Sequence, residues 1–344
     1  MKYASRMAAA TAILVASALP ALAAGQLNIF NSGLYTPPDL IAKFEKTYDV
    51  KVTVTEYDSN ESALAKIQAG GHGFDIIVPS AYIVPTYIEN GLLLKSEPNQ
   101  MSNFKNVKPD WVDVAWDKGR HYTVPYDWGL TGIMVNTKVY KGDLNTAAMI
   151  FDPPPELKGK VNVPPSLLEV IDMAINYVGG QACTTDKAIL KKAHDKLMEA
   201  KASWASIDYP SFEKFVKEDI QASIFWNGAS LRIRAENPGF AFGLPKTGFQ
   251  IWQDNVAILK DAKNVENAKL FLNFVMEPDN AALISNYTRY SNSIIGSEAK
   301  MDPELINAPE LKIPEELKAA GHYQATCSPE VQQIYSRIWT DLTK

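Results

Sequence analysis

Metal-binding and catalytic motifs are scarce in this chain of 344 residues, which has only four histidines and two cysteines. His72, His121, His194 and His322 are scattered, and no two of them stand at the spacing of a zinc-binding pair. The chain also lacks a Gly-x-Ser-x-Gly nucleophile elbow and a phosphate-binding Gly-Lys-Ser/Thr loop. We therefore expect no metal, no cofactor and no catalytic residue.

The chain also has fewer basic than acidic residues and few long apolar runs. The chain has 34 Lys and Arg against 39 Asp and Glu, a formal net charge of −5, so we expect no nucleic-acid partner. An Ala-rich apolar run follows Lys2 and Arg6 and ends in Ala21-Leu-Ala-Ala24, which is the pattern of a secretory signal peptide. The run is shorter than the ~20 residues that span a bilayer. We expect residues 1–23 to be removed on export to the periplasm.

The two cysteines, Cys183 and Cys327, are far apart in the sequence. In an exported protein such a pair suggests one disulfide, and the alternative is two unpaired buried thiols. The length of the mature chain suits two lobes of roughly 150 residues each. A bridge requires that both cysteines belong to the same lobe.

The first third of the chain alternates strands and helices. We expect strands at 26–31, 50–57 and 74–78, and helices at 40–46, 62–69 and 84–90. Asp58 and Glu61 have the spacing of a capping box before the second helix. This order is typical of a mostly parallel α/β sheet with helices on both faces.

The remainder is less regular but still α/β. We expect strands at 122–128, 132–136, 159–163, 222–227 and 249–258, and helices at 166–177, 187–200, 262–275 and 278–287. The chain is expected to cross between two lobes near Gly132 and again near Gln253. Two open α/β lobes joined in this way form a cleft, and ligands of such sheets bind beyond the carboxyl ends of the strands.

The stretch from Phe249 to Ile258 carries the sharpest functional signal. Trp252 and Asp254 lie on the same face of this strand, because side chains alternate with period two. A buried carboxylate needs a cationic partner. If that partner is a ligand amine, Trp252 supplies a cation–π wall beside it. The structural alternative is a strand end where Asp254 caps a turn and Trp252 belongs to the core.

Aromatic residues gather near predicted strand and loop ends. They are Tyr35, Tyr82, Trp128, Trp226, Trp252 and Tyr290. Each alone is more often a core residue than a site residue. Together with Glu169 and Asp254 they describe an aromatic box with anionic ends, which suits an alkyl ammonium. Two alternatives are a tyrosine site for ferric iron at Tyr287 and Tyr290, and an acid–base pair formed by Glu169 and Asp254.

With these residues the chain resembles the periplasmic receptors of polyamine ABC importers, the putrescine and spermidine binding proteins. The resemblance is carried by Asn31-x-x-x-Tyr35-x-x-Pro-Asp39, Tyr57-Asp-Ser-Asn-Glu61, Phe74-Asp-Ile-Ile-Val-Pro-Ser80, Pro125-Tyr-x-Trp128, Phe225-Trp-Asn-Gly228, Trp252-x-Asp254 and Leu270-Phe-Leu-Asn-Phe274. It implies the two-lobed class II periplasmic binding protein fold with a hinge and an interlobe cleft. Residues 24–132 plus 254–298 would form lobe 1, and residues 133–253 plus 299–344 would form lobe 2. Both cysteines would then share lobe 2.

The resemblance also implies ligand contacts at the positions that match. These are Tyr35, Ser80, Tyr82, Glu169, Trp226, Trp252, Asp254, Tyr290 and, in the tail, Gln324. The chain departs from the family pattern at three places, because residues 32–34, Ser166 and Ala229 stand where polyamine receptors commonly have acids. One end of the cleft is therefore expected to lack anions.

That departure shapes the expected ligand. A buried diamine would leave one ammonium unpaired, at a cost on the order of several kcal/mol. The main hypothesis is therefore an ω-amino acid such as 4-aminobutyrate (GABA), held amine-first at Glu169 and Asp254. Its carboxylate would need Arg232 or Arg289, and the alternative for either arginine is a solvated surface charge. The alternatives are a putrescine/spermidine receptor and, more remotely, a secreted enzyme acting on an amine. We expect a monomer that delivers its ligand to the membrane permease of an ABC importer.

Overall fold

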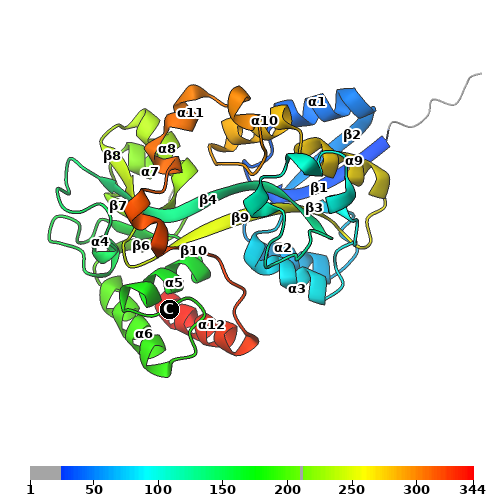
Figure 1. Ribbon diagram of the computed structural model, residues 1–344. Coiled ribbons are helices and arrows are strands. Elements are labelled where there is room, and N and C mark those ends of the chain that lie inside the picture. Colours follow the sequence, from blue (N-terminus) through cyan, green and yellow to red (C-terminus); the bar gives the residue numbers. More distant parts are fainter. Residues whose placement is uncertain (1–24, 210–211) are drawn as a thin grey trace, which may run out of the picture.

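The computed structural model describes residues 25–209 and 212–344, so the predicted signal peptide at residues 1–23 lies outside the described residues. The molecule has two halves, and the long strands β4 (Thr123–Asn136) and β9 (Phe249–Ile258) run from one half to the other (Figure 1). The other strands are β1 Gly25–Ser32, β2 Val50–Tyr57, β3 Ile76–Ile77, β5 Val161–Val163, β6 Trp204–Ile207, β7 Ala222–Trp226, β8 Phe240–Gly243 and β10 Gly321–Tyr323.

Helices cover both halves of the sheet (Figure 1). They are α1 Pro38–Tyr48, α2 Asn60–Gln68, α3 Val84–Glu89, α4 Ala148–Phe151, α5 Leu167–Tyr177, α6 Lys187–Lys201, α7 Phe212–Val216, α8 Asn227–Glu236, α9 Val265–Val275, α10 Pro278–Thr288, α11 Pro303–Asn307 and α12 Pro329–Thr343. No helix within the described ranges combines the length and apolar character needed to cross a membrane.

One mixed sheet connects the halves, in the order β2-β1-β3-β9-β4-β7-β5-β6. Its two ends are parallel, as the alternating pattern predicts, because β1 pairs with β2 and β3 while β5 pairs with β6 and β7. Its middle is antiparallel, because β9 lies between β3 and β4, and β4 also pairs with β7. The predicted α/β class is therefore confirmed.

Each half has its own hydrophobic core. Leu27, Phe44 and Phe271 are buried in the core around β1, α1 and α9. Ala193 and Tyr335 are buried in the core around α5, α6 and α12. The predicted lobe boundaries at 132/133, 253/254 and 298/299 stay a proposal.

β4 is one strand where the sequence predicts two. Gly129 continues the pairing with β9 opposite Trp252, so the expected break before Gly132 does not occur. A second difference is the N-terminal cap of α2. The Ser59 hydroxyl accepts a hydrogen bond from the Ser62 backbone N–H, and the Ser62 hydroxyl accepts one from the Ser59 backbone N–H. The predicted capping box of Asp58 and Glu61 is therefore wrong.

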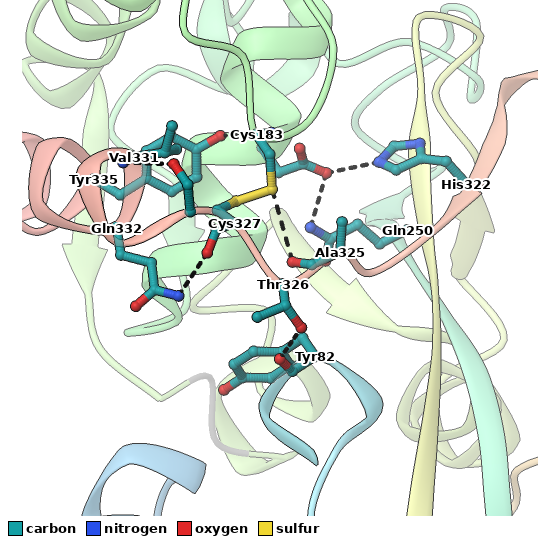
Figure 2. Close-up of a disulfide and its surroundings, with 12 residues drawn as sticks. Tyr82, Cys183, Gln250, His322, Ala325, Thr326, Cys327, Val331, Gln332 and Tyr335 are labelled. Carbon is teal, nitrogen blue, oxygen red and sulfur yellow. Dashed lines mark hydrogen bonds and ion pairs between the residues drawn. A yellow bond between two sulfur atoms is a disulfide. The ribbon is translucent and has the colours of Figure 1, made fainter. Parts of the chain in front are cut away.

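The two cysteines form a disulfide. The Sγ atoms of Cys183 and Cys327 are 1.96 Å apart, which links the loop after α5 to the tail before α12 (Figure 2). The predicted bridge is thus confirmed. Upstream of Cys327 the tail adds β10 to β9, with Gly321 opposite Phe249. The tail is therefore held at both of its ends, by a strand pairing and by a covalent bond.

Candidate functional site

Two aspartates face each other where β4 and β9 pass between the halves. Asp127 of β4 is the antiparallel partner of Asp254 of β9, although the ladder runs in step only up to Pro125. The register shifts there, so that Tyr126 is the extra residue of a β-bulge. A bulge re-aims the side chains that follow it, and here it brings two carboxylates opposite one another.

Asp254 is 8% exposed, and its carboxylate has a hydroxyl partner. Ser80 Oγ, at the end of the segment after β3, donates to Asp254 Oδ1 at 2.5 Å. Asn60 in turn donates to Ser80 Oγ at 3.0 Å. Burial raises the pKa of Asp254 to about 6, and the bond from Ser80 works in the opposite direction.

Asp127 is fully buried, and sequence reasoning missed it. Its Oδ1 accepts from the Tyr35 hydroxyl at 3.2 Å, while its Oδ2 has no hydrogen-bond partner among the described residues. Burial raises the pKa of Asp127 well above its usual range, and the charge of Asp254 raises it further. Asp127 thus adds an acid beside Asp254, and the expectation that the other end of the cleft lacks anions stays a prediction.

Glu169 approaches from the other half, in the first turn of α5. It is 5% exposed, and its Oε1 accepts from Thr131 Oγ1 and from Trp226 Nε1, each at 2.7 Å. Burial raises the pKa of Glu169, and these neutral donors offset part of that rise. The charge of Glu169 in turn helps to raise the pKa of Asp254.

Aromatic rings surround these acids. Trp252 and Tyr290 meet edge to face with centroids 4.8 Å apart, and Tyr35 lies 6.0 Å from Tyr290. Two glycines make this packing possible. A Cβ on Gly129 would stand 2.3 Å from the Trp252 ring, and one on Gly228 would stand 2.5 Å from Tyr290. We define the acid–aromatic cluster as Tyr35, Asp127, Glu169, Trp226, Trp252, Asp254 and Tyr290.

Tyr82 and Gln324, also predicted as site residues, lie where the tail meets the first half. Tyr82 OH donates to Glu61 at 2.8 Å, and the Tyr82 carbonyl oxygen accepts from the Thr326 hydroxyl (Figure 2). Gln324 Nε2 donates to Gln250 Oε1 at 3.0 Å, and its own Oε1 is buried without a partner among the described residues. The tail therefore brings polar groups beside β9.

A short polar chain fixes this part of the tail. Gln250 of β9 and His322 of β10 both bond to Asp172 Oδ2, at 2.8 and 2.7 Å. Asp172 is buried in α5, one turn after Glu169. Gln250 and His322 approach from neighbouring strands in Figure 2. Helix α5, which positions Glu169, is thus hydrogen-bonded to side chains of β9 and β10.

The remaining predicted aromatic and basic residues lie in different environments. Trp128 packs on Trp111 with centroids 5.8 Å apart and donates to the Asn292 carbonyl, so it belongs to the core. Arg289 is engaged with Asp302 at 2.7 Å. Arg232 donates to the Thr288 carbonyl at 3.3 Å, and its charge opposes the rise that burial imposes on the pKa of Tyr290. Arg232 is therefore the arginine near the cluster.

A separate pocket of about 520 Å³ is lined by no residue of the cluster. Ala81 and Gln324 line it together with Trp111, Trp116 and Tyr323. It shares only Gln324 with the predicted ligand contacts, and we do not assign the ligand to it. In the described part of the chain, no group of three or more His, Cys, Asp or Glu side chains is arranged to hold a metal ion.

Two halves joined by crossing strands, with buried acids and rings at the crossing, define a two-lobed solute-binding protein. Residues 39–313 match the model of the bacterial extracellular solute-binding proteins, and the chain belongs to that family. The family resemblance and the two-lobed fold expected from the sequence are therefore confirmed.

Individual relatives agree with this assignment. The spermidine/putrescine-binding periplasmic protein of Escherichia coli K12 is 30% identical over 319 residues, 91% of either chain. The putrescine/cadaverine-binding protein of Pseudomonas aeruginosa is 31% identical over 291 residues, 80% of this chain and 81% of the relative. The solved structure of a candidate spermidine/putrescine ABC transporter protein from Listeria monocytogenes superposes with a TM-score of 0.86 at 29% identity, covering 93% of this chain and 99% of that one.

Proposed function

We propose that the protein is a periplasmic receptor of an ABC importer, which captures a small diamine or polyamine such as putrescine and delivers it to a membrane permease. The observation that carries the proposal is the pair Asp254 and Glu169. Both carboxylates are buried beside aromatic rings, and their hydrogen-bond partners in the described chain are hydroxyls and an indole. Buried anions of this kind call for a cation, which the ligand supplies.

The charge of the cluster favours a dication over an ω-amino acid. Asp127 adds a third buried acid, so a ligand carboxylate would enter a region that is already anionic. The names of the relatives point the same way, since those relatives bind putrescine, spermidine or cadaverine. We therefore place the polyamine alternative ahead of 4-aminobutyrate.

A second candidate ligand rests on Arg232. Its guanidinium lies near Tyr290, at the edge of the acid–aromatic cluster. An ω-amino acid could place its amine at Asp254 and turn its carboxylate toward this arginine, because guanidinium groups bind carboxylates bidentately. 4-Aminobutyrate is the smallest ligand that we propose to test for this arrangement.

Such a site would bind its ligand by closure of the two lobes, with no catalytic step. Glu169 and Asp254 come from different halves, so one ligand contacts both only when the halves are closed. The relatives are binding proteins, which supports a receptor over an enzyme acting on amines. Export follows from the predicted signal peptide, and we expect the mature N-terminus at Ala24 or Gly25.

Isothermal titration of the purified mature protein tests the proposal. Putrescine, cadaverine, spermidine and 4-aminobutyrate are titrated separately at pH 7.5, after unfolding and refolding to remove any retained ligand. We expect tight binding of at least one diamine or polyamine and binding at least tenfold weaker for 4-aminobutyrate. Tight binding of 4-aminobutyrate with no response to any of the diamines or polyamines would reverse the choice of ligand.

A further inference from the structure

The Asp127 carboxylate is the least satisfied charged group of the cluster. Its side chain is fully buried, only one of its oxygens has a hydrogen-bond partner in the described chain, and that partner is a neutral phenol. A buried carboxylate costs several kcal/mol unless a cation and further hydrogen bonds compensate it. The fold therefore buries an acid whose second oxygen has no partner among the described residues.

The nearest fully buried cation does not serve Asp127. Arg120 makes its bonds to Trp111, Thr123, Gln253 and Asn255. Gln253 and Asn255 alternate with Asp254 along β9, so Arg120 lies on the opposite face of that strand from Asp254. Among the described residues, no hydrogen bond or ion pair gives Asp127 a cationic partner.

We propose that Asp127 is a ligand-contacting residue that holds one ammonium group of a diamine, together with Asp254, while the second ammonium lies at Glu169. This inference rests on the proposed function and names the residues that make the site selective for two charges. Asp127 and Asp254 are direct cross-strand partners. Glu169 is contributed by α5 of the other half and is buried as well.

The surroundings of Asp127 fit an ammonium group. Tyr35 and Tyr126 have ring centroids 6.0 Å apart, and the Tyr35 hydroxyl bonds directly to Asp127. The Tyr290 ring lies next to this pair, with its centroid 6.0 Å from the centroid of the Tyr35 ring. Aromatic faces attract ammonium groups, and a carboxylate oxygen without another partner accepts a charge-assisted hydrogen bond. Asp127 Oδ2 supplies that oxygen.

A comparison of diamine and monoamine binding tests the inference. Putrescine and butylamine have the same four-carbon chain but differ by one ammonium, and both are titrated into wild type and Asp127→Asn. In wild type we expect putrescine to bind at least 100-fold more tightly than butylamine. In Asp127→Asn we expect the putrescine affinity to fall at least tenfold and the butylamine affinity to change less than threefold, because butylamine would use Glu169.

The controls separate this inference from the proposed function. Asp75→Asn changes another buried aspartate, whose oxygens bond to the backbone N–H groups of Asn28, Lys263 and Asn264, and it should leave the ratio of the two affinities unchanged. If Asp127→Asn fails to fold, Asp127→Thr takes its place. Wild type that binds no amine would refute the proposed function. Wild type that binds putrescine, with an Asp127 variant that binds it equally well, would refute only the role of Asp127.

Discussion

Both faces of β9 are buried, but one face packs against a buried cation and the other carries buried acids. On one face, Gln253 and Asn255 point to the fully buried guanidinium of Arg120. On the other face, Trp252 and Asp254 point into the acid–aromatic cluster. One strand thus separates a buried cation from buried acids. All three nitrogens of the cation have partners inside the protein, whereas Asp127 Oδ2 has none among the described residues.

The Arg120 face is a completed network. Nε donates to the Trp111 carbonyl at 3.0 Å, and the terminal nitrogens donate to Thr123, Asn255 and Gln253 at 2.7–2.9 Å. Burial lowers the pKa of Arg120 to about 9, and the charge of Asp117 opposes that change. The guanidinium also lies 5.7 Å from the Trp116 ring. All of these partners of the guanidinium belong to the folded chain itself.

The Asp254 face is incomplete by the same standard. Its acids have raised pKa values because burial is not balanced by a cation. Unbalanced ionisable groups that cluster where two lobes meet are typical of functional sites. The comparison teaches that burial alone does not identify a binding residue. What distinguishes the two faces is whether the protein supplies the opposite charge or its hydrogen-bond equivalents.

The largest effect is expected on the Arg120 face. Arg120→Met leaves the Gln253 Oε1 acceptor unpaired in the core and removes a donor from Asn255 and from Thr123. We expect a loss of about 3–5 kcal/mol in the free energy of unfolding. Denaturant titration of ligand-free protein measures it. Arg337→Met, on the exposed side of α12, is the matched control and should change stability by less than about 0.5 kcal/mol. A similar small change for Arg120→Met would remove the contrast between the faces.

The opposite result is expected for Asp254→Asn. Neutralising a buried, uncompensated carboxylate should leave the ligand-free protein as stable as wild type or up to about 3 kcal/mol more stable at pH 7. Affinity for putrescine should fall at least tenfold, because the ammonium loses its counter-charge. Denaturation and calorimetry on the same preparation measure both quantities. Loss of stability in the ligand-free variant would favour the structural interpretation of Asp254.

The pH dependence of stability sharpens the comparison. The folded pKa of Asp254 is about 6, above the unfolded value of about 3.9, so between these values the folded protein holds more protons. The contribution of Asp254 to the free energy of unfolding must then fall as pH rises from about 4 to 6. We expect the difference between Asp254→Asn and wild type to be near zero below pH 4 and to grow toward about 3 kcal/mol above pH 6. A difference that is constant from pH 4 to 8 would contradict this account.

The sequence predicts one of the crossing strands far better than the other. The bounds of β9 are predicted correctly at 249–258, and its period-two alternation places Trp252 and Asp254 on one face. For β4 the same reasoning predicts two strands, at 122–128 and 132–136. In the structure Gly129 instead makes room for the Trp252 ring, a long-range contact that no local pattern shows.

Asp127 was missed for a related reason. The argument applied to Asp254, that an acid in an apolar strand needs a cation, applies equally to Asp127 within Pro125-Tyr-Asp-Trp128. Its position opposite Asp254 depends on the bulge at Tyr126, however, and strict alternation does not reveal a bulge. Pro125, which cannot donate to the ladder, was the available signal of an irregularity.

The smallest expected effect concerns the hydroxyl that Ser80 donates to Asp254 at 2.5 Å. Because this bond favours the ionised acid, Ser80→Ala should raise the pKa of Asp254 and weaken putrescine binding by about 1 kcal/mol, roughly fivefold, at pH 8. The loss should be greater at pH 6, where more of the variant carries a protonated Asp254 that cannot pair with an ammonium. Ser336→Ala on exposed α12 controls for the substitution itself. Equal losses at pH 6 and pH 8 would mean that Ser80 acts on the ligand directly and leaves the ionisation of Asp254 unchanged.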